Sequence, residues 1–140
     1  MRALTFRSAL AAASATAALG ALLVAAPPAQ AAGPSFCDEA TGDTCLYYNS
    51  GRTGGFYGAS QNVVNYTSDM KFGIGNGKGL PVKNNAASVY NFHRIWNVTI
   101  YYNSNKSCAY ACQSFAPKTG GNLNSQMKNN NASQGYWLPA

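Results

Sequence analysis

A pair of repeated phrases constrains the fold of this chain more strongly than any other sequence feature. Tyr-Tyr-Asn-Ser occupies residues 47–50 and returns at 101–104, and Lys-Asn-Asn-Ala-Ala-Ser at 83–88 returns as Lys-Asn-Asn-Asn-Ala-Ser at 128–133. A repeat of about 40–50 residues indicates one structural motif that is built twice. The two phrases are offset by 54 and 45 residues, so the copies differ in loop length. We place copy one at about 44–92 and copy two at about 97–138.

Short β-rich runs between turn residues indicate strands rather than helices. Apolar residues do not recur at helical spacing, whereas Val98, Ile100 and Tyr102 alternate with more polar neighbours, as in a half-buried strand. We expect strands at 44–48, 88–92, 95–102 and 135–138. Four of the eight residues in each of 51–58 and 72–79 are glycine, which predicts loops or turns with positive φ. Such connections predict an all-β antiparallel sandwich or barrel, with one four-stranded Greek key per copy.

The first 31 residues have the features of a secretory signal peptide. Arg2 and Arg7 precede an apolar run over 9–26 that is rich in alanine and leucine, and an Ala-Gln-Ala cleavage sequence ends at residue 31. A retained membrane anchor is the alternative, but the apolar run is barely long enough to span a membrane and no basic stop-transfer cluster follows it. We therefore expect a secreted, extracellular protein without membrane insertion, folded as a single domain over residues 32–140.

The charge of the mature chain is positive but dispersed. Removal of the signal peptide takes two arginines away, so the formal net charge falls from +6 to +4. The remaining lysines and arginines form no run, whereas nucleic-acid-binding proteins concentrate basic residues on one face or helix. We expect a monomer with no nucleic-acid partner, and a mild attraction to an anionic cell envelope stays open.

All four cysteines, Cys37, Cys45, Cys108 and Cys112, lie in the exported part of the chain. An even number of cysteines in a small secreted domain indicates disulfides. Four cysteines allow three connectivities, and the spacing favours the local pairs Cys37–Cys45 and Cys108–Cys112, each near one copy of the repeat. Zinc is the competing interpretation, but the sole histidine, His93, has no metal-like spacing to either pair.

The sequence contains no arrangement of residues that suits catalysis. His93 is the only histidine and lies at the end of a predicted strand beside Arg94, so a structural or surface role fits it better than that of a base. Acid–base chemistry by Asp38 and Asp43 is conceivable, but carboxylates crowded around a short cysteine loop more often serve as exposed solvating charge. We expect a protein that is not an enzyme and that requires no cofactor.

A tyrosine-led strand, a glycine-rich turn and a closing Asn-Asn-x-x-Ser turn, present twice, resemble the Greek key of the βγ-crystallins. The signal peptide, the two local cysteine pairs and Lys-Asn-Asn-Ala-Ala-Ser-Val-Tyr at 83–90 narrow the resemblance to the bacterial secreted peptidase inhibitors of family 36, the SMPI-like metalloproteinase inhibitors. The resemblance covers about residues 36–138. It implies a βγ-crystallin-like sandwich of two Greek-key motifs and an inhibitor of an extracellular protease, in the first place a zinc metalloprotease.

The segment between Cys108 and Cys112 is the predicted inhibitory loop. The family resemblance implies a reactive region near this second cysteine pair, with Ala109 or Tyr110 as the anchor in a protease cleft. A loop closed by a disulfide is ordered before it binds, so less conformational entropy is lost on binding. Tyrosine is also enriched among the residues that dominate interfaces. The alternative is structural: the disulfide only holds a hairpin together, and the enclosed residues, Ala109, Tyr110 and Ala111, bind no partner although the tyrosine is exposed.

The two Asn-Asn-x-x-Ser turns are the candidate metal sites, because turns of this kind bind calcium in βγ-crystallins. The resemblance carries this role over to Asn84, Asn85, Ser88, Asn129, Asn130 and Ser133. Calcium accepts amide, hydroxyl and carbonyl oxygens, but neither turn has a carboxylate, so binding would be weak. The alternative is structural, since asparagine adopts left-handed backbone geometry and bonds its own backbone in tight turns.

Three functions remain, and the fold alone does not decide among them. The first is inhibition of an extracellular protease by substrate-like binding of the 108–112 loop, and this is our prediction. The second is a killer-toxin-like or antimicrobial protein that acts at cell surfaces. The predicted fold resembles that of such toxins, and a positive net charge would favour binding to an anionic cell envelope. The third is an extracellular calcium-binding or structural module.

Overall fold

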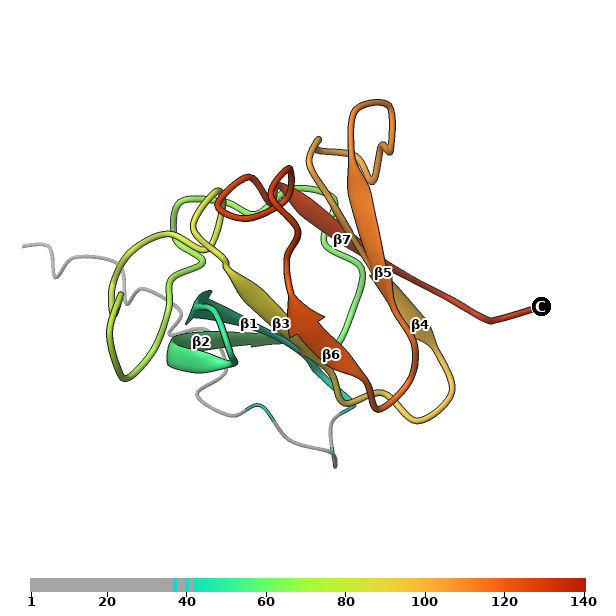
Figure 1. The fold of residues 1–140 in the computed structure, drawn as a ribbon, viewed down its shortest axis with the longest axis horizontal. Coiled ribbons are helices and arrows are strands. Elements are labelled where there is room, and N and C mark those ends of the chain that lie inside the picture. The colour runs from blue at the N-terminus through green and yellow to red at the C-terminus, as the bar shows by residue number, and fades with distance from the viewer. Residues whose placement is uncertain (1–36, 38–39, 41) are drawn as a thin grey trace, which may run out of the picture.

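The computed structural model describes Cys37, Ala40 and residues 42–140, and these residues form seven β-strands and no helix (Figure 1). The strands are β1 (Thr44–Asn49), β2 (Thr53–Ala59), β3 (Ser88–Asn91), β4 (Asn97–Tyr101), β5 (Cys112–Phe115), β6 (Gly120–Asn122) and β7 (Ser133–Trp137). The predicted signal peptide at 1–31 lies outside the described residues, as does Asp38. Within the described part, no helix has the length and hydrophobicity needed to cross a membrane.

The strands form two antiparallel sheets that exchange elements between the two copies (Figure 1). The first sheet has the order β2-β1-β3-β6, and the second has the order β5-β4-β7. β6 belongs to copy two by sequence, yet it pairs with β3 of copy one. In the other direction, Val63 of copy one bridges to Gln134 in β7, with N···O distances of 3.0 and 2.9 Å. Each copy is therefore a Greek key whose third element joins the partner sheet, and the predicted two-Greek-key sandwich is confirmed.

The core lies between the sheets and takes alternate residues from the central strands. Leu46 in β1 and Val98 and Ile100 in β4 are fully buried, and Tyr102 packs against them. Val98, Ile100 and Tyr102 thus face the core as the sequence predicts, but β4 is not half-buried, because Asn97 and Thr99 on its other face are buried too. The opposite face of β4 is also covered, because the indole of Trp137 donates a 2.9 Å hydrogen bond from Nε1 to Oγ1 of Thr99.

Four strands lie where the sequence predicts them, and one predicted loop is wrong. β1, β3, β4 and β7 match the expected runs to within two residues at each end. Residues 51–58 were expected to be a loop, but most of them form β2. A Cβ atom on Gly55 would lie 3.0 Å from the carbonyl oxygen of Asn76 and 3.1 Å from that of Gly73. The glycines of β2 therefore admit a second backbone against the strand, which a turn-based interpretation of glycine overlooks.

The other glycine-rich segment, 72–79, contains no strand, as the sequence predicts. It forms the yellow-green loop that extends from the body of the molecule in Figure 1. β5 and β6 have no counterpart among the predicted strands. The Gly-Gly-Asn sequence of β6 shows no alternation, and its pairing depends on contacts with β3 that are remote in sequence.

Candidate functional site

Both predicted disulfides are present. Cys37 is bonded to Cys45 with a Cα–Cα distance of 5.6 Å, and Cys108 is bonded to Cys112 with a Cα–Cα distance of 5.3 Å. No described cysteine is free. The first disulfide ties the chain to a fully buried residue of β1, whereas the second closes a loop at the start of β5. The second disulfide therefore shapes a loop whose residues are all described.

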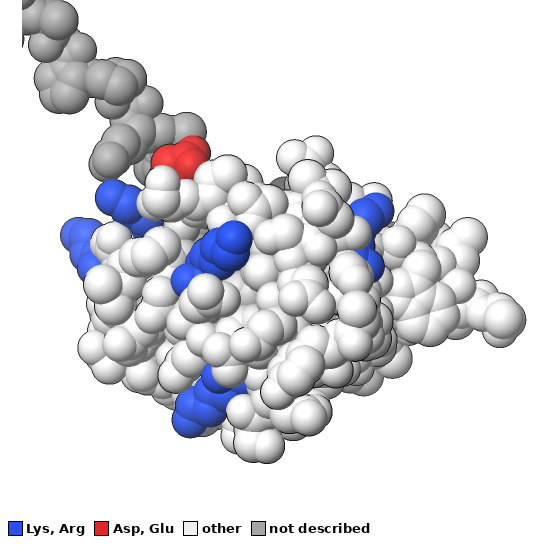
Figure 2. Space-filling view, turned by 90° about the horizontal axis from the view of Figure 1, so that it is seen from above, with Lys and Arg blue, Asp and Glu red and all other residues white. Residues whose placement is uncertain are grey.

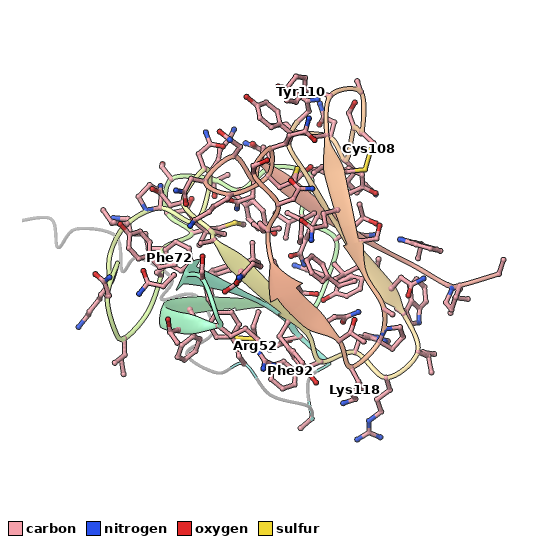
Figure 3. The ribbon with its side chains drawn as sticks, viewed as in Figure 1. Arg52, Phe72, Phe92, Cys108, Tyr110 and Lys118 are labelled. Carbon is pink, nitrogen blue, oxygen red and sulfur yellow. A yellow bond between two sulfur atoms is a disulfide. The ribbon has the colours of Figure 1, made fainter. Side chains whose placement is uncertain are left out.

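The loop between Cys108 and Cys112 presents an outward-facing tyrosine (Figure 3). Its base is held where Tyr102 N–H donates a 3.0 Å hydrogen bond to the carbonyl oxygen of Ala111, whose own side chain is buried. At the tip, 65% of Tyr110 is exposed, and its ring centroid lies 4.6 Å from that of Tyr102. The loop is thus closed covalently, anchored at one end, and provided with a side chain that already packs in one position.

The two Asn-Asn turns meet and bond to each other. Asn84 and Asn129 both adopt positive φ, 61° and 59°, which is the left-handed geometry that the sequence predicts for these turns. Asn84 N–H donates to the carbonyl oxygen of Asn131, and Asn129 N–H donates to that of Ala86, both at 2.8 Å. The buried Asn131 side chain adds further bonds, since its amide oxygen accepts from Ala86 N–H at 3.0 Å. The turns therefore act as a clasp between the copies.

The serines that close the turns repeat the same contacts in both copies. Ser88 Oγ donates to the carbonyl oxygen of Asn49 and Ser133 Oγ donates to that of Asn103, both at 2.6 Å. Each serine hydroxyl also accepts a backbone N–H, from Arg52 at 2.9 Å for Ser88 and from Lys106 at 3.1 Å for Ser133. These hydroxyls hold the β-hairpins of their own copy.

The predicted calcium ligands are only partly brought together. Asn85 and Asn129, one from each turn, line the same small cavity of about 210 Å³, which Lys128 also lines. The side-chain amide of Asn85 donates to two carbonyl oxygens of its own turn at 3.0 Å, and that of Asn130 does the same at 3.1 and 3.3 Å. Among the described residues, no group of three or more histidine, cysteine or carboxylate side chains is placed to hold a metal ion.

The residues considered for catalysis have structural surroundings. Nδ1 of His93 accepts hydrogen bonds from the backbone N–H groups of Ile95 and Trp96, at 3.3 and 3.0 Å, and so fixes the loop between β3 and β4. Asp43 is 3% exposed just before β1, whereas Asp69, which was not a candidate for catalysis, is exposed in the segment between β2 and β3. A hydrogen bond from the Thr67 hydroxyl is the main cause that lowers the pKa of Asp69.

An aromatic groove on the outer face of the first sheet was not predicted from the sequence; two of its lining residues, Arg52 and Phe92, are labelled in Figure 3. The groove has a volume of about 410 Å³ and is lined by Tyr47, Gly51, Arg52, Tyr90 and Phe92. The Arg52 guanidinium carbon lies 5.0 Å from the centre of the Tyr90 ring, a cation–π distance. Burial raises the pKa of Tyr47, and the positive charge of Arg52 opposes that rise. The tyrosine of the repeated phrase was the only signal that pointed to this face.

The surface charge matches the dispersed pattern of the sequence. Figure 2 shows lysine and arginine side chains at separate places on one face, with uncharged surface between them. No continuous basic surface of the kind that follows a nucleic-acid backbone is visible on that face.

Solved structures with similar folds are βγ-crystallin domains. One is reported for the evolution of the eye lens βγ-crystallin domain fold, with a TM-score of 0.53 and 12% identity over 71% of this chain and 88% of that one. A βγ-crystallin domain from Flavobacterium johnsoniae and the N-terminal domain of protein S each give a TM-score of 0.50 and 14% identity, over 69% of this chain and 96% of theirs. The described part of the chain therefore has the βγ-crystallin fold.

The family follows from the sequence match. The model of peptidase inhibitor family I36 matches residues 30–113, and the chain belongs to this family. The protein is accordingly a peptidase inhibitor and not an enzyme, and its partner is a protease. Two disulfides and this membership fit an extracellular protein. No curated protein sequence matches the chain at a significant level.

Proposed function

We propose that the protein is a secreted, monomeric inhibitor of an extracellular zinc metalloprotease, and that residues 108–112 enter the protease cleft. One observation carries the proposal. Tyr110 is 65% exposed on a disulfide-closed loop, yet its ring already packs against Tyr102 at 4.6 Å. A side chain that is accessible and ordered in advance loses little conformational freedom when a protease binds it.

The disulfide also provides a reason why cleavage of the loop need not release the inhibitor. If a protease cuts between Ala109 and Tyr110, the bond between Cys108 and Cys112 keeps the new amine and carboxylate tethered. Tethered groups react at a high effective concentration, so re-formation of the peptide bond competes with dissociation. The loop would thus occupy the cleft as a substrate that leaves slowly.

The chemistry of the loop supports a target with an apolar specificity pocket. Ala109, Tyr110 and Ala111 carry no charge, whereas a trypsin-like pocket with a buried aspartate selects a cationic side chain. The resemblance to SMPI-like inhibitors supports a zinc metalloprotease among the remaining classes. The signal-peptide features of residues 1–31 support secretion.

Replacement of Tyr110 by glycine tests the role of the loop. We expect Tyr110→Gly to raise the inhibition constant for the target protease at least about 30-fold, as the loss of an interface hot spot does. The free energy of unfolding should change by no more than about 1 kcal/mol, because the side chain is mostly exposed. Inhibition assays against thermolysin-like, subtilisin-like and trypsin-like proteases, with thermal melts of each variant, measure both quantities.

The matched control is Tyr110→Phe, which keeps the ring contact with Tyr102 and should inhibit almost as well as the native protein. Loss of stability with unchanged inhibition by Tyr110→Gly would contradict the assignment of the loop. A native protein that inhibits no protease of the panel, but binds cells in a salt-sensitive manner, would instead support the toxin-like alternative.

We further propose that the Asn-Asn turns serve as a structural clasp and hold calcium only weakly. The turns lack carboxylates, and the cavity that Asn85 and Asn129 share is also lined by a lysine. For a dissociation constant of about 1 mM, 1 mM calcium would stabilise the fold by about 0.4 kcal/mol. Thermal melts in calcium and in a chelator measure this difference, and a gain of several kcal/mol would show a genuine calcium site.

A further inference from the structure

Ile74 has the largest exposed fraction, 77%, among the large apolar side chains that the structure finds exposed. Single apolar residues are common on protein surfaces, so exposure alone carries no functional meaning. Ile74 differs because the glycine-rich loop that presents it, residues 72–79, is fixed at its base, along its side and from within.

The base of the loop is closed by backbone hydrogen bonds around a buried anchor. Phe72 N–H donates to the carbonyl oxygen of Leu80 at 3.0 Å, and Gly79 N–H donates to that of Phe72 at 2.9 Å. The Phe72 side chain is 2% exposed and meets the Tyr48 ring edge-on at 5.7 Å. The loop therefore begins and ends at one fixed point of the core.

The side of the loop is bonded to β2 before and after the tip. Gly73 N–H donates to the carbonyl oxygen of Phe56 at 2.9 Å, and Gly55 N–H donates to that of Asn76 at 2.7 Å. Ile74 and its neighbour Gly75 lie between these two bonds in the chain. The tip is thus clamped on both flanks, as a reactive loop must be to hold one shape in a protease cleft.

Glycine packing fixes the loop from within. Gly77 has a φ of 86°, and a Cβ atom there would overlap the ring of Tyr48. Gly75 has a φ of 115°, and a Cβ atom there would lie 2.8 Å from the carbonyl carbon of Gly54. These contacts need glycine at both positions, so the flanks of Ile74 have little freedom to rearrange.

The main chain at the tip is available to a partner. Among the described residues, neither the N–H nor the carbonyl oxygen of Ile74 takes part in a backbone hydrogen bond. Extended peptides bind to other proteins through such free main-chain groups, while alternate side chains fill pockets. An exposed aliphatic side chain with free main-chain groups on a clamped loop has the chemistry of a protease substrate.

We propose that residues 73–77 form a second protease-binding loop, in which Ile74 fills the apolar specificity pocket of an endopeptidase. This inference rests on the proposed function, because it assumes a protease as the partner. In Figure 3, Phe72 at the base of this loop lies well apart from Tyr110 and Cys108. The two loops therefore offer separate contact sites, one from each copy of the repeat.

The test measures inhibition constants of the mature protein and its variants against the same three protease classes. We expect Ile74→Ala to raise the inhibition constant at least about 30-fold for at least one protease with an apolar pocket. The matched control is Ile95→Ala, which shortens another exposed isoleucine (59%) in the β3–β4 loop and should change no constant more than about twofold. Thermal melts confirm that both variants fold.

A second measurement locates the contact directly. Prolonged incubation of the native protein with the inhibited protease, followed by mass spectrometry, should reveal slow cleavage next to Ile74. The inference is overturned if Ile74→Ala leaves every inhibition constant within about twofold while Tyr110→Gly raises them, since the proposed function then stands without it. If the native protein inhibits no protease of the panel, the proposed function fails and this inference fails with it.

Discussion

The two exposed loops of this inhibitor are held in shape by different means. The 108–112 loop in copy two is closed by one disulfide and is anchored at its end, where Ala111 accepts a backbone hydrogen bond and Cys112 begins β5. The 72–79 loop in copy one has no covalent closure, and it depends on hydrogen bonds to β2 and on close glycine packing. Closure by a disulfide places few limits on which side chains the 108–112 loop can carry. Hydrogen bonds and glycine packing restrict nearly every residue of the 72–79 loop, so the two loops should respond differently to substitutions.

The largest effect should follow from a methyl group at Gly77. Gly77→Ala forces a non-glycine residue into positive φ and pushes a Cβ atom into the Tyr48 ring, so we expect a loss of about 2–4 kcal/mol in the free energy of unfolding. Chemical denaturation measures the loss. Gly79→Ala is the matched control, because φ is also positive (82°) but nothing lies within 4 Å of the added atom. Equal losses for both variants would show that the Tyr48 contact does not fix the loop.

A smaller effect should follow from removal of the second disulfide. Replacing Cys108 and Cys112 together by serine opens a loop whose ends are four residues apart. The chain-entropy model predicts that the free energy of unfolding falls by about 2 kcal/mol. Inhibition that depends on Tyr110 should fall, while inhibition that depends on Ile74 should persist. Replacing Cys37 and Cys45 together by serine is the control, since this disulfide belongs to neither loop. Persistence of Tyr110-dependent inhibition without the Cys108–Cys112 bond would contradict a role for covalent closure.

The smallest effect should be a loss of local stability in acid that is confined to the 72–79 loop. The Thr67 hydroxyl lowers the pKa of Asp69, just before that loop, below its ordinary value of 3.8. The charged carboxylate therefore contributes stability above the ordinary value, and this contribution is lost as the pH falls through the lowered one. The 108–112 loop contains no carboxylate. The hydrogen-exchange protection factors of the 72–79 loop should fall at low pH, and Asp69→Asn should remove this response.

The repeated phrases made most of the fold predictable. β1, β3, β4 and β7 all contain or adjoin a repeated phrase, and the alternation of Val98 and Ile100 identified the face of β4 that enters the hydrophobic core. β2 was not predicted because glycine serves two structural purposes that a sequence does not distinguish. It permits positive φ in a turn, and it also lets another backbone approach, as Gly55 does beside Asn76.

The candidate site was predictable only where covalent chemistry or a repeat marked it. The cysteine spacing predicted both disulfides, and the Asn-Asn turns predicted the positive φ of Asn84 and Asn129. Asn131 was missed, although its buried side-chain amide bonds Val82 and Ala86 of the other copy, because an asparagine that varies between the copies looked incidental. Ile74 was missed because one apolar residue among glycines has no periodicity, and its exposure follows only from contacts between remote segments.

The pairing of β6 with β3, and of Val63 with Gln134, has a consequence for assembly. Neither half of the chain is self-sufficient, because each leaves a sheet edge that only the other half covers. We therefore expect the two halves to melt cooperatively, so that one transition reports damage to either. The vacant edge of a detached half would accept the matching half of another molecule equally well. The contacts that close one molecule on itself are thus also those through which two molecules would form a domain-swapped dimer.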